Sequence, residues 1–226
     1  MTPPETAFLF DLDGTLVDSV YDHVIAWHDA LADEGIELSF WRIHRKIGMS
    51  GGLFTNMLLR ETGYEISEER ISRMRRLHAE YYSKRSGLIR PLPGARELLS
   101  FLTGAGIPWA IATSGRMETA GPVLRHLGVD TTITPVVTRD QVRFAKPDPD
   151  LFIEAAHRLD LDIRNACVVG DSIGDMLAAR RCHSLGIGLL SGGYGEDELL
   201  RAGAYRVFED PADMLTHIDE LGGRRR

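Results

Sequence analysis

Short apolar segments alternate with amphipathic segments along most of this 226-residue chain, and this alternation restricts the folds open to it. The apolar segments have the length and content of buried strands, at Phe8–Phe10, Ile107–Ala112, Thr134–Thr138, Ala166–Val169, Leu185–Leu190 and, more weakly, Tyr205–Phe208. Segments with helical periodicity separate them, at residues 94–105, 116–127, 148–160, 173–182 and 195–202. Strands that alternate with helices of this length form parallel β-α units. The sequence therefore predicts an α/β fold with a doubly wound parallel sheet.

One long region breaks this alternation. Residues 18–90 have helical patterns throughout, at 18–34, 39–46, 51–62 and 67–86, with glycines between them, and Pro91 and Pro93 follow. The sequence thus predicts an α/β core domain of residues 1–17 and 91–226, with an inserted all-helical domain at residues 18–90. Because the insertion directly follows the first strand, it is placed to act as a lid over that strand's end.

Charge and hydropathy exclude several classes of protein. The formal net charge of −7 argues against nucleic-acid binding, which needs a basic surface. No apolar run approaches the roughly 20 residues that span a bilayer, and the first residues lack the features of a secretory signal. We expect a cytoplasmic protein that binds neither nucleic acid nor membrane, with Cys167 and Cys182 as free thiols.

The first strand ends in two carboxylates, Asp11 and Asp13, followed by Gly14. Open α/β sheets bind ligands at the carboxyl ends of their strands. Two aspartates in that position could bind a divalent cation, and one of them could attack an electrophile such as phosphorus. The alternative is an ordinary Asp-Gly turn after a strand.

Two further segments carry polar groups to the same edge of the predicted sheet. Thr113, Ser114 and Gly115 end the second strand, and with the backbone N–H groups entering a helix at Arg116 they could form an anion pocket. The alternative is a simple helix N-cap. Lys146, held in a loop by the following proline, could offset repulsion between carboxylates and a phosphate. A lone loop lysine is otherwise a solvated surface residue.

A second acidic pair follows the strand at 166–169. Asp171 comes after Gly170, and Asp175 lies one helical turn further on. The alternative for this pair is a turn with a capping serine and a favourable charge at a helix N-terminus. Four clustered aspartates need a positive centre, because like charges a few ångströms apart cannot all stay ionised. An all-oxygen site of this kind fits Mg²⁺ and not the His/Cys pattern of zinc.

Together these segments resemble the haloacid dehalogenase superfamily, specifically its Mg²⁺-dependent phosphatases. The family's four blocks occur in order, as Asp11-Leu-Asp13-Gly-Thr-Leu-Val-Asp18-Ser19, Thr113-Ser114-Gly115, Lys146-Pro147 and Gly170-Asp171-Ser172-x-x-Asp175. The helical insertion is similar to the type 1 cap of phosphoglycolate phosphatases and β-phosphoglucomutases. The resemblance implies a Rossmann-like core beneath a helical cap.

The resemblance also implies a role for each matching residue. Asp11 would attack phosphorus and become an aspartyl phosphate, and Asp13 would protonate the leaving oxygen and then take a proton from water. Thr113 and the adjoining Ser114, Gly115 and Arg116 would hold the phosphate and substrate, with Lys146 steadying Asp11. Mg²⁺ would be bound by Asp11, Asp171 and the carbonyl of Asp13, with Asp175 supporting the site. The second aspartate disfavours dehalogenase chemistry, since the dehalogenases of the superfamily lack it.

The predicted cap bears on the substrate. His23 and Trp27 share one face of its first helix; His23 would either contact the site or fill the hinge, whereas Trp27 is better explained as core. Gly51 stands where the β-phosphoglucomutases have an arginine that grips a second phosphate, which weakens the mutase alternative. Arg45, Lys46 or Arg116 could replace that arginine, although such residues are usually surface charges.

The sequence therefore predicts a Mg²⁺-dependent phosphatase, a monomer or homodimer, that acts on a small phosphorylated metabolite such as phosphoglycolate or a sugar phosphate. Two alternatives remain open. One is a β-phosphoglucomutase-like sugar-phosphate mutase. The other is a catalytically silent homologue that binds a phosphorylated ligand or a protein, against which speaks the absence of a disabling residue at the predicted catalytic positions.

Overall fold

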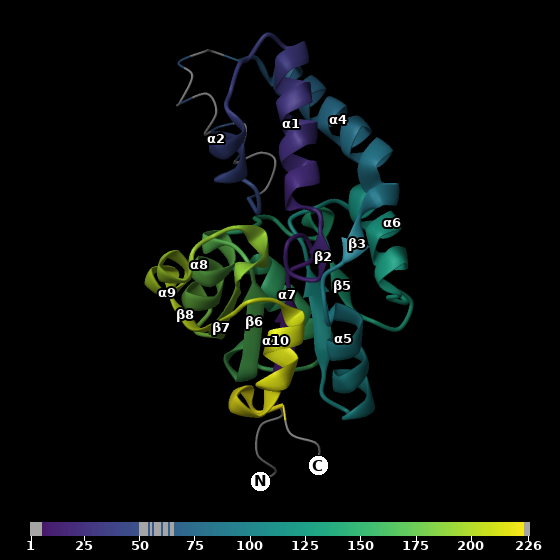
Figure 1. The fold of residues 1–226 in the computed structure, drawn as a ribbon, viewed down its shortest axis with the longest axis vertical. Coiled ribbons are helices and arrows are strands. Elements are labelled where there is room, and N and C mark those ends of the chain that lie inside the picture. Colours follow the sequence, from purple (N-terminus) through teal and green to yellow (C-terminus); the bar gives the residue numbers. More distant parts are fainter. Residues whose placement is uncertain are drawn as a thin grey trace.

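The structure is a computed structural model that describes residues 6–49, 54, 56, 60, 63 and 66–223. Its sheet contains β1 (Ala7–Phe10), β4 (Trp109–Ala112), β5 (Val136–Val137), β6 (Ala166–Gly170), β7 (Leu185–Leu189) and β8 (Ala204–Phe208). The strand order is β5-β4-β1-β6-β7-β8, and every neighbouring pair is parallel. The predicted doubly wound parallel sheet is confirmed (Figure 1). In the strand order, β1 lies between β4 and β6, in the middle of the sheet.

Helices cover both faces of this sheet, which explains why its strands are apolar along their whole length. Phe8 and Phe10 pack on one face with α5 (Ala95–Gly104), α6 (Met117–Leu127) and α10 (Pro211–Thr216). Leu9 points to the other face, which is covered by α7 (Asp150–Arg158) and α8 (Ile173–Arg181). Beyond them, α9 (Glu196–Ala202) packs at the edge of β8.

A helical layer lies above the carboxyl ends of the strands (Figure 1). It contains α1 (Val20–Asp33), α2 (Phe40–His44) and α4 (Glu68–Arg85), which share an apolar core of their own around Trp27, Leu31 and Met74. These helices match the predictions for 18–34, 39–46 and 67–86. The helix predicted at 51–62 lies largely outside the described residues. We refer to residues 18–90 below as the cap and to the α/β part as the core.

A two-stranded antiparallel ribbon links the cap to the core. It consists of β2 (Val17–Asp18) and β3 (Arg90–Pro91), and both predicted domain boundaries fall within it. Because both crossings of the chain lie in this ribbon, we propose that the cap is an inserted domain.

The structure differs from the sequence prediction in a few elements. The ribbon and α10 were not predicted, and the strand expected at Thr134–Thr138 is reduced to two residues. Pro135 lacks an N–H group, so it joins the sheet only through its carbonyl, which accepts a bond from Ile111. Cys167 and Cys182 are both free, as predicted, and both are buried. Among the described helices, none is both long and apolar enough to cross a membrane.

Candidate active site

The four predicted segments meet at the carboxyl edge of the sheet. Asp11 directly follows β1, Thr113 follows β4 and Asp171 follows β6, and these three strands are neighbours in the sheet. Lys146 reaches the same place from the loop before α7. The side chains of Asp11, Asp171 and Lys146 are all buried.

Lys146 joins two of the carboxylates. Its Nζ lies 2.5 Å from Asp11 Oδ1 and 2.8 Å from Asp175 Oδ1, and its side chain has no exposed surface. Its ammonium group also lies 4.9 Å from the centre of the Phe152 ring. Burial alone would lower the pKa of Lys146, but Asp11 and Asp175 outweigh burial and raise that pKa. Lys146 therefore stays charged and anchors the site.

The carboxylates of Asp11, Asp171 and Asp175 form a buried cluster. One oxygen from each lies within 4.8 Å of the others. Burial raises the pKa of Asp11 to about 7, with Lys146 opposing that rise and Asp175 adding to it. Burial, Asp175 and Asp11 likewise raise the pKa of Asp171 well above its usual range. Lys146 supplies one positive charge to three carboxylates, so this hard-oxygen donor set fits a divalent cation.

Hydrogen bonds and close backbone contacts hold two members of this cluster in place. Thr15 Oγ1 donates to Asp171 Oδ1 at 2.9 Å, and Ser172 Oγ donates to Asp175 Oδ2 at 2.6 Å. Gly14 and Gly192 also press against Asp171: a Cβ on either residue would stand 2.6 or 1.8 Å from Asp171 Oδ2. Gly192 was not among the predicted site residues, because nothing near it in the chain indicates its contact with Asp171.

Asp13 has different surroundings from the acidic cluster, because its side chain faces the cap. Its Oδ1 accepts a hydrogen bond from Ser19 Oγ at 2.5 Å and one from Tyr82 OH at 3.3 Å, and lies 3.3 Å from His23 Nε2. Burial would raise the pKa of Asp13, but the charge of His23 and these hydrogen bonds prevail and lower it to about 2. Tyr82 was not among the predicted site residues, since its spacing on α4 is also that of a core aromatic.

A cavity of about 530 Å³ lies between the cap and the core. The predicted residues that line it are Asp11, Asp13, His23, Thr113, Ser114, Gly115 and Arg116. Lys146, Asp171 and Asp175 are not among its lining residues; they lie in the buried cluster that adjoins Asp11. The structure thus places Asp11 and the loop of Thr113, Ser114 and Gly115 at the cavity. The buried side chains of Lys146, Asp171 and Asp175 lie behind them.

The residues predicted to bind the phosphate form hydrogen bonds and an ion pair with their neighbours. Thr113 Oγ1 accepts from the backbone N–H of Gly115 at 2.9 Å, and Ser114 Oγ donates to the carbonyl of Gly48 in the cap at 3.1 Å. Arg116 pairs with Asp140 at 3.1 Å. Ser114 therefore also connects core to cap.

His23 contacts the site, one of the two roles left open for it, and Trp27 belongs to the apolar core of the cap. His23 lines the cavity and contacts Asp13, and its Nδ1 lies 3.1 Å from His78 Nε2. Trp27 is 5% exposed, packs against Phe54 and His78, and also lines the cavity. Arg45, considered above as a substrate contact, instead pairs with Glu198 of the core.

Known proteins are similar to this chain over most of its length. The family model for haloacid dehalogenase-like hydrolases matches residues 5–183. A phosphoglycolate phosphatase of Agrobacterium fabrum is 32% identical over 188 residues, which are 81% of this chain and 80% of that protein. Hexitol phosphatase A of Escherichia coli is 35% identical over 187 residues, which are 80% of this chain and 82% of that protein. These names agree with the predicted class of enzyme, a phosphoric monoester hydrolase.

Solved structures agree with the fold. A hydrolase from Pseudomonas syringae superposes with a TM-score of 0.94 at 53% identity, over 96% of this chain and 99% of that one. A β-phosphoglucomutase from Clostridium difficile superposes with a TM-score of 0.84 at 25% identity, over 96% of each chain. The family match spans most of the sequence, includes the loops that build the acidic cluster and confirms the predicted resemblance, so this chain belongs to the haloacid dehalogenase-like hydrolases.

Proposed function

We propose that this protein is a Mg²⁺-dependent phosphatase that hydrolyses a small phosphorylated metabolite through an aspartyl-phosphate intermediate on Asp11. The observation that carries the proposal is the position of Asp11. It lines the cavity, its carboxylate contacts the buried Lys146, and it shares a cation-sized cluster with Asp171 and Asp175. A nucleophile at phosphorus needs such surroundings, because phosphoryl transfer depends mainly on positioning and on neutralising charge.

In the first step, a carboxylate oxygen of Asp11 attacks phosphorus and the bond from phosphorus to the leaving oxygen breaks. Asp13 gives its proton to that oxygen, which leaves as an alcohol. The Thr113 hydroxyl and the backbone N–H group of Ser114 hold the phosphoryl oxygens, and Lys146 offsets part of their charge.

In the second step, a water molecule attacks the aspartyl phosphate, Asp13 takes the water's proton, and Asp11 is released with inorganic phosphate. The hydrogen bonds that lower the pKa of Asp13 suit this step, because they keep a carboxylate ready to accept a proton. The first step needs the protonated form, which the negative charge of a bound phosphate ester favours. Asp13 can thus serve as acid and then as base.

A divalent cation is part of the proposed mechanism. Asp11, Asp171 and the backbone carbonyl of Asp13 would hold Mg²⁺, with Asp175 supporting the site. Mg²⁺ suits an all-oxygen site that leaves room for waters and a phosphate. When bound, it would neutralise charge on the transferring phosphoryl group.

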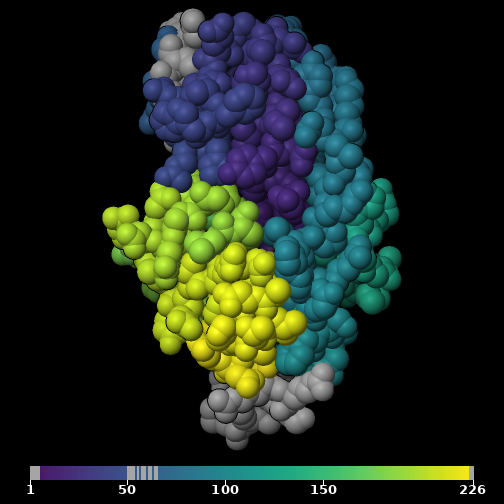
Figure 2. Space-filling view, in the orientation of Figure 1, coloured from purple at the N-terminus to yellow at the C-terminus, as the bar shows by residue number. Residues whose placement is uncertain are grey.

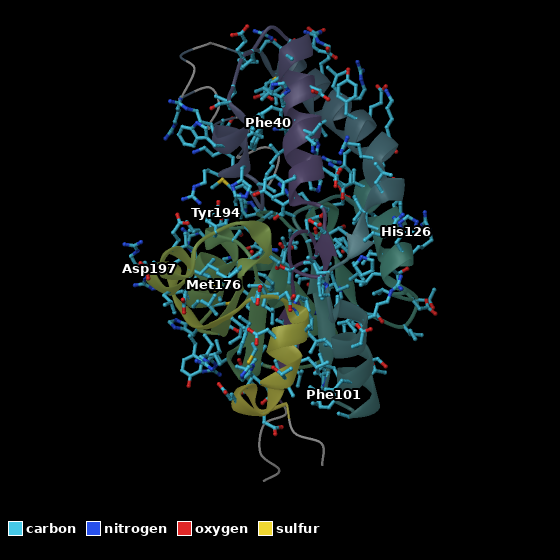
Figure 3. The ribbon with its side chains drawn as sticks, viewed as in Figure 1. Phe40, Phe101, His126, Met176, Tyr194 and Asp197 are labelled. Atoms are coloured by element: carbon cyan, nitrogen blue, oxygen red, sulfur yellow. The ribbon has the colours of Figure 1, made fainter. Side chains whose placement is uncertain are left out.

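Removing the nucleophile tests this proposal. With a generic aryl phosphate and Mg²⁺, Asp11→Asn should lower kcat by at least about 10³-fold, since the amide cannot form the intermediate. The matched control is Asp197→Asn, which removes one carboxylate from the exposed surface of α9 (Figure 3) and should leave turnover unchanged. Chelation of divalent ions with EDTA should abolish wild-type turnover, and added Mg²⁺ should restore it. Wild-type turnover by Asp11→Asn would refute the assignment.

The reaction products distinguish the mutase alternative from the proposed hydrolase. A hydrolase releases one inorganic phosphate for each ester consumed, whereas a mutase returns an isomeric sugar phosphate without free phosphate. Isomerised hexose phosphates with no phosphate released would overturn the hydrolase proposal.

A further inference from the structure

The cavity has a second charged region, apart from the catalytic aspartates. Arg75 of the cap and Arg116 and Arg139 of the core all line it, together with Lys46 of the cap. The acidic side chains that line the cavity, besides Asp11 and Asp13, are Glu118 and Asp140. Asp140 already pairs with Arg116, which is largely exposed. Among the described residues that line this part of the cavity, cationic side chains therefore outnumber acidic ones.

Arg75 lies on the face of α4 that lines the cavity. Tyr82 of the same helix bonds to Asp13, and Arg75 is seven residues before it, about 10 Å along a helix that rises 1.5 Å per residue. His78 lies between them on this face and lines the cavity too. Arg75 is thus placed to meet a part of the substrate remote from the leaving oxygen.

Arg139 approaches from the core. Its backbone N–H donates to the carbonyl of Gly115 at 2.9 Å, which ties it to the loop that carries Thr113. Its side chain donates to the carbonyl of Val142 at 2.7 Å, which orients the guanidinium. A guanidinium carries five N–H donors, so most of those of Arg139 remain for a ligand.

The two arginines repel each other. Burial lowers the pKa of Arg75, and the charges of Arg116 and Arg139 lower it further, while Glu68 opposes them. Like charges that converge on a partly buried space cost free energy, and an anion bound between them would recover that cost.

We propose that the substrate carries a second anionic group, separated from the scissile phosphate by a short carbon skeleton, and that Arg75 and Arg139 bind it. This inference rests on the proposed phosphatase activity and narrows its substrate class. A carboxylate and a second phosphate share the chemistry that two guanidiniums recognise. Neutral sugar and polyol phosphates would lack this contact.

Matched substrate pairs test the proposal. Phosphoglycolate is compared with hydroxyethyl phosphate, and phosphogluconate with glucitol phosphate, so that each pair differs only in a carboxylate. Glucose bisphosphate against glucose monophosphate tests a second phosphate instead. The wild-type protein should favour the more anionic member of at least one pair by about tenfold or more in kcat/KM, the effect of a charge-assisted hydrogen bond.

Variants then assign the preference to the two arginines. Arg75→Gln and Arg139→Gln should each lower kcat/KM about 10- to 100-fold for the preferred anionic substrate, and change it less than about threefold for its neutral counterpart. Arg75→Lys keeps the charge and should retain part of the preference. Arg76→Gln is the matched control, because Arg76 is exposed and does not line the cavity.

The outcomes separate this inference from the proposed function. If the wild-type protein hydrolyses an aryl phosphate but shows no preference within any pair, the anion site is wrong and the phosphatase stands. Equal losses on both members of a pair in the arginine variants would also overturn it. If the wild-type protein does not hydrolyse an aryl phosphate at all, the phosphatase proposal is refuted instead.

Discussion

Asp171 is confined by backbone rather than by large side chains. Gly14 and Gly192 approach it so closely that neither position has room for a Cβ. Thr15 completes its surroundings with a hydrogen bond to Oδ1. Groups that orient a metal ligand in this way commonly change metal affinity 10- to 100-fold when they are altered.

Gly192→Ala should therefore weaken activation by Mg²⁺. The new Cβ would stand 1.8 Å from Asp171 Oδ2 and would force that carboxylate to move. We expect the Mg²⁺ concentration for half-maximal activity to rise about 10- to 100-fold. Gly195→Ala is the control, because its Cβ would meet only Glu198 Oε2, at an ordinary 3.5 Å. An unchanged Mg²⁺ requirement in Gly192→Ala would show that Asp171 does not need this support.

At the scale of the element, the N-terminus of α8 stabilises both the helix and the site. Ser172 Oγ accepts from the backbone N–H of Asp175, and the Asp175 side chain accepts from the backbone N–H of Ser172. This reciprocal capping box satisfies two backbone donors at the helix start. It also fixes the carboxylate that contacts Lys146.

Ser172→Ala should thus lower both stability and activity. Loss of an N-cap costs about 1 kcal/mol, which is roughly 2 to 4 °C in Tm for a protein of this size. The control is Ser67→Ala, which removes the N-cap of α4, whose serine accepts from the N–H of Arg70. Both variants should have a lower Tm, but only Ser172→Ala should also require a higher Mg²⁺ concentration for half-maximal activity. A purely structural role for Ser172 would leave the Mg²⁺ requirements of the two variants equal.

At the scale of the whole molecule, one loop of the core contacts both the cap and the acidic cluster. His44 Nε2 lies 2.8 Å from the carbonyl of Gly192, and Tyr194 OH donates to the carbonyl of Arg45 at 3.1 Å. Tyr194 lies between α2 and the core (Figure 3), and the surface near residue 190 meets the blue surface of the cap (Figure 2). Since Gly192 also touches Asp171, contacts of the cap and of the acidic cluster converge on this loop.

Stability should depend on Mg²⁺ and pH together. The raised pKa values of Asp11 and Asp171 mean that the folded, metal-free protein binds protons more tightly than the unfolded chain does. Its stability therefore falls as pH rises from about 4, the unfolded value, to about 7. The lowered pKa of Asp13 has the opposite effect and stabilises the folded protein. This stabilisation is lost only as pH falls below about 4, outside that range.

A divalent cation relieves this repulsion, so the gain in Tm from Mg²⁺ should grow between pH 5 and pH 8. At 100 times its dissociation constant, Mg²⁺ should stabilise the protein by about 2.7 kcal/mol, or roughly 5 to 10 °C. Thermal melts with Mg²⁺ and with EDTA across this pH range measure the effect. A gain that is constant with pH would contradict the assignment of this cluster as the cation site.

The sequence alone accounts for most of the fold and for the residues that end its strands. Periodicity located β1, β4, β6 and β7 because helices bury both of their faces, so the strands are apolar throughout. It overestimated β5, where a proline limits pairing, and it missed the ribbon of β2 and β3, whose strands are too short to leave a pattern.

What the sequence determined by itself is local: the order of strands and helices, and the aspartates, threonine and lysine that follow particular strands. Their chemistry follows from residue type and short spacing, so it can be read along the chain. The tertiary structure alone decided which groups surround them. Thr15 bonds to Asp171 across 156 residues, Tyr82 of the cap bonds to Asp13, and Arg75 and Arg139 line one cavity from two parts of the molecule. Such contacts depend on how the cap packs over the sheet, and this packing leaves no local signal in the chain.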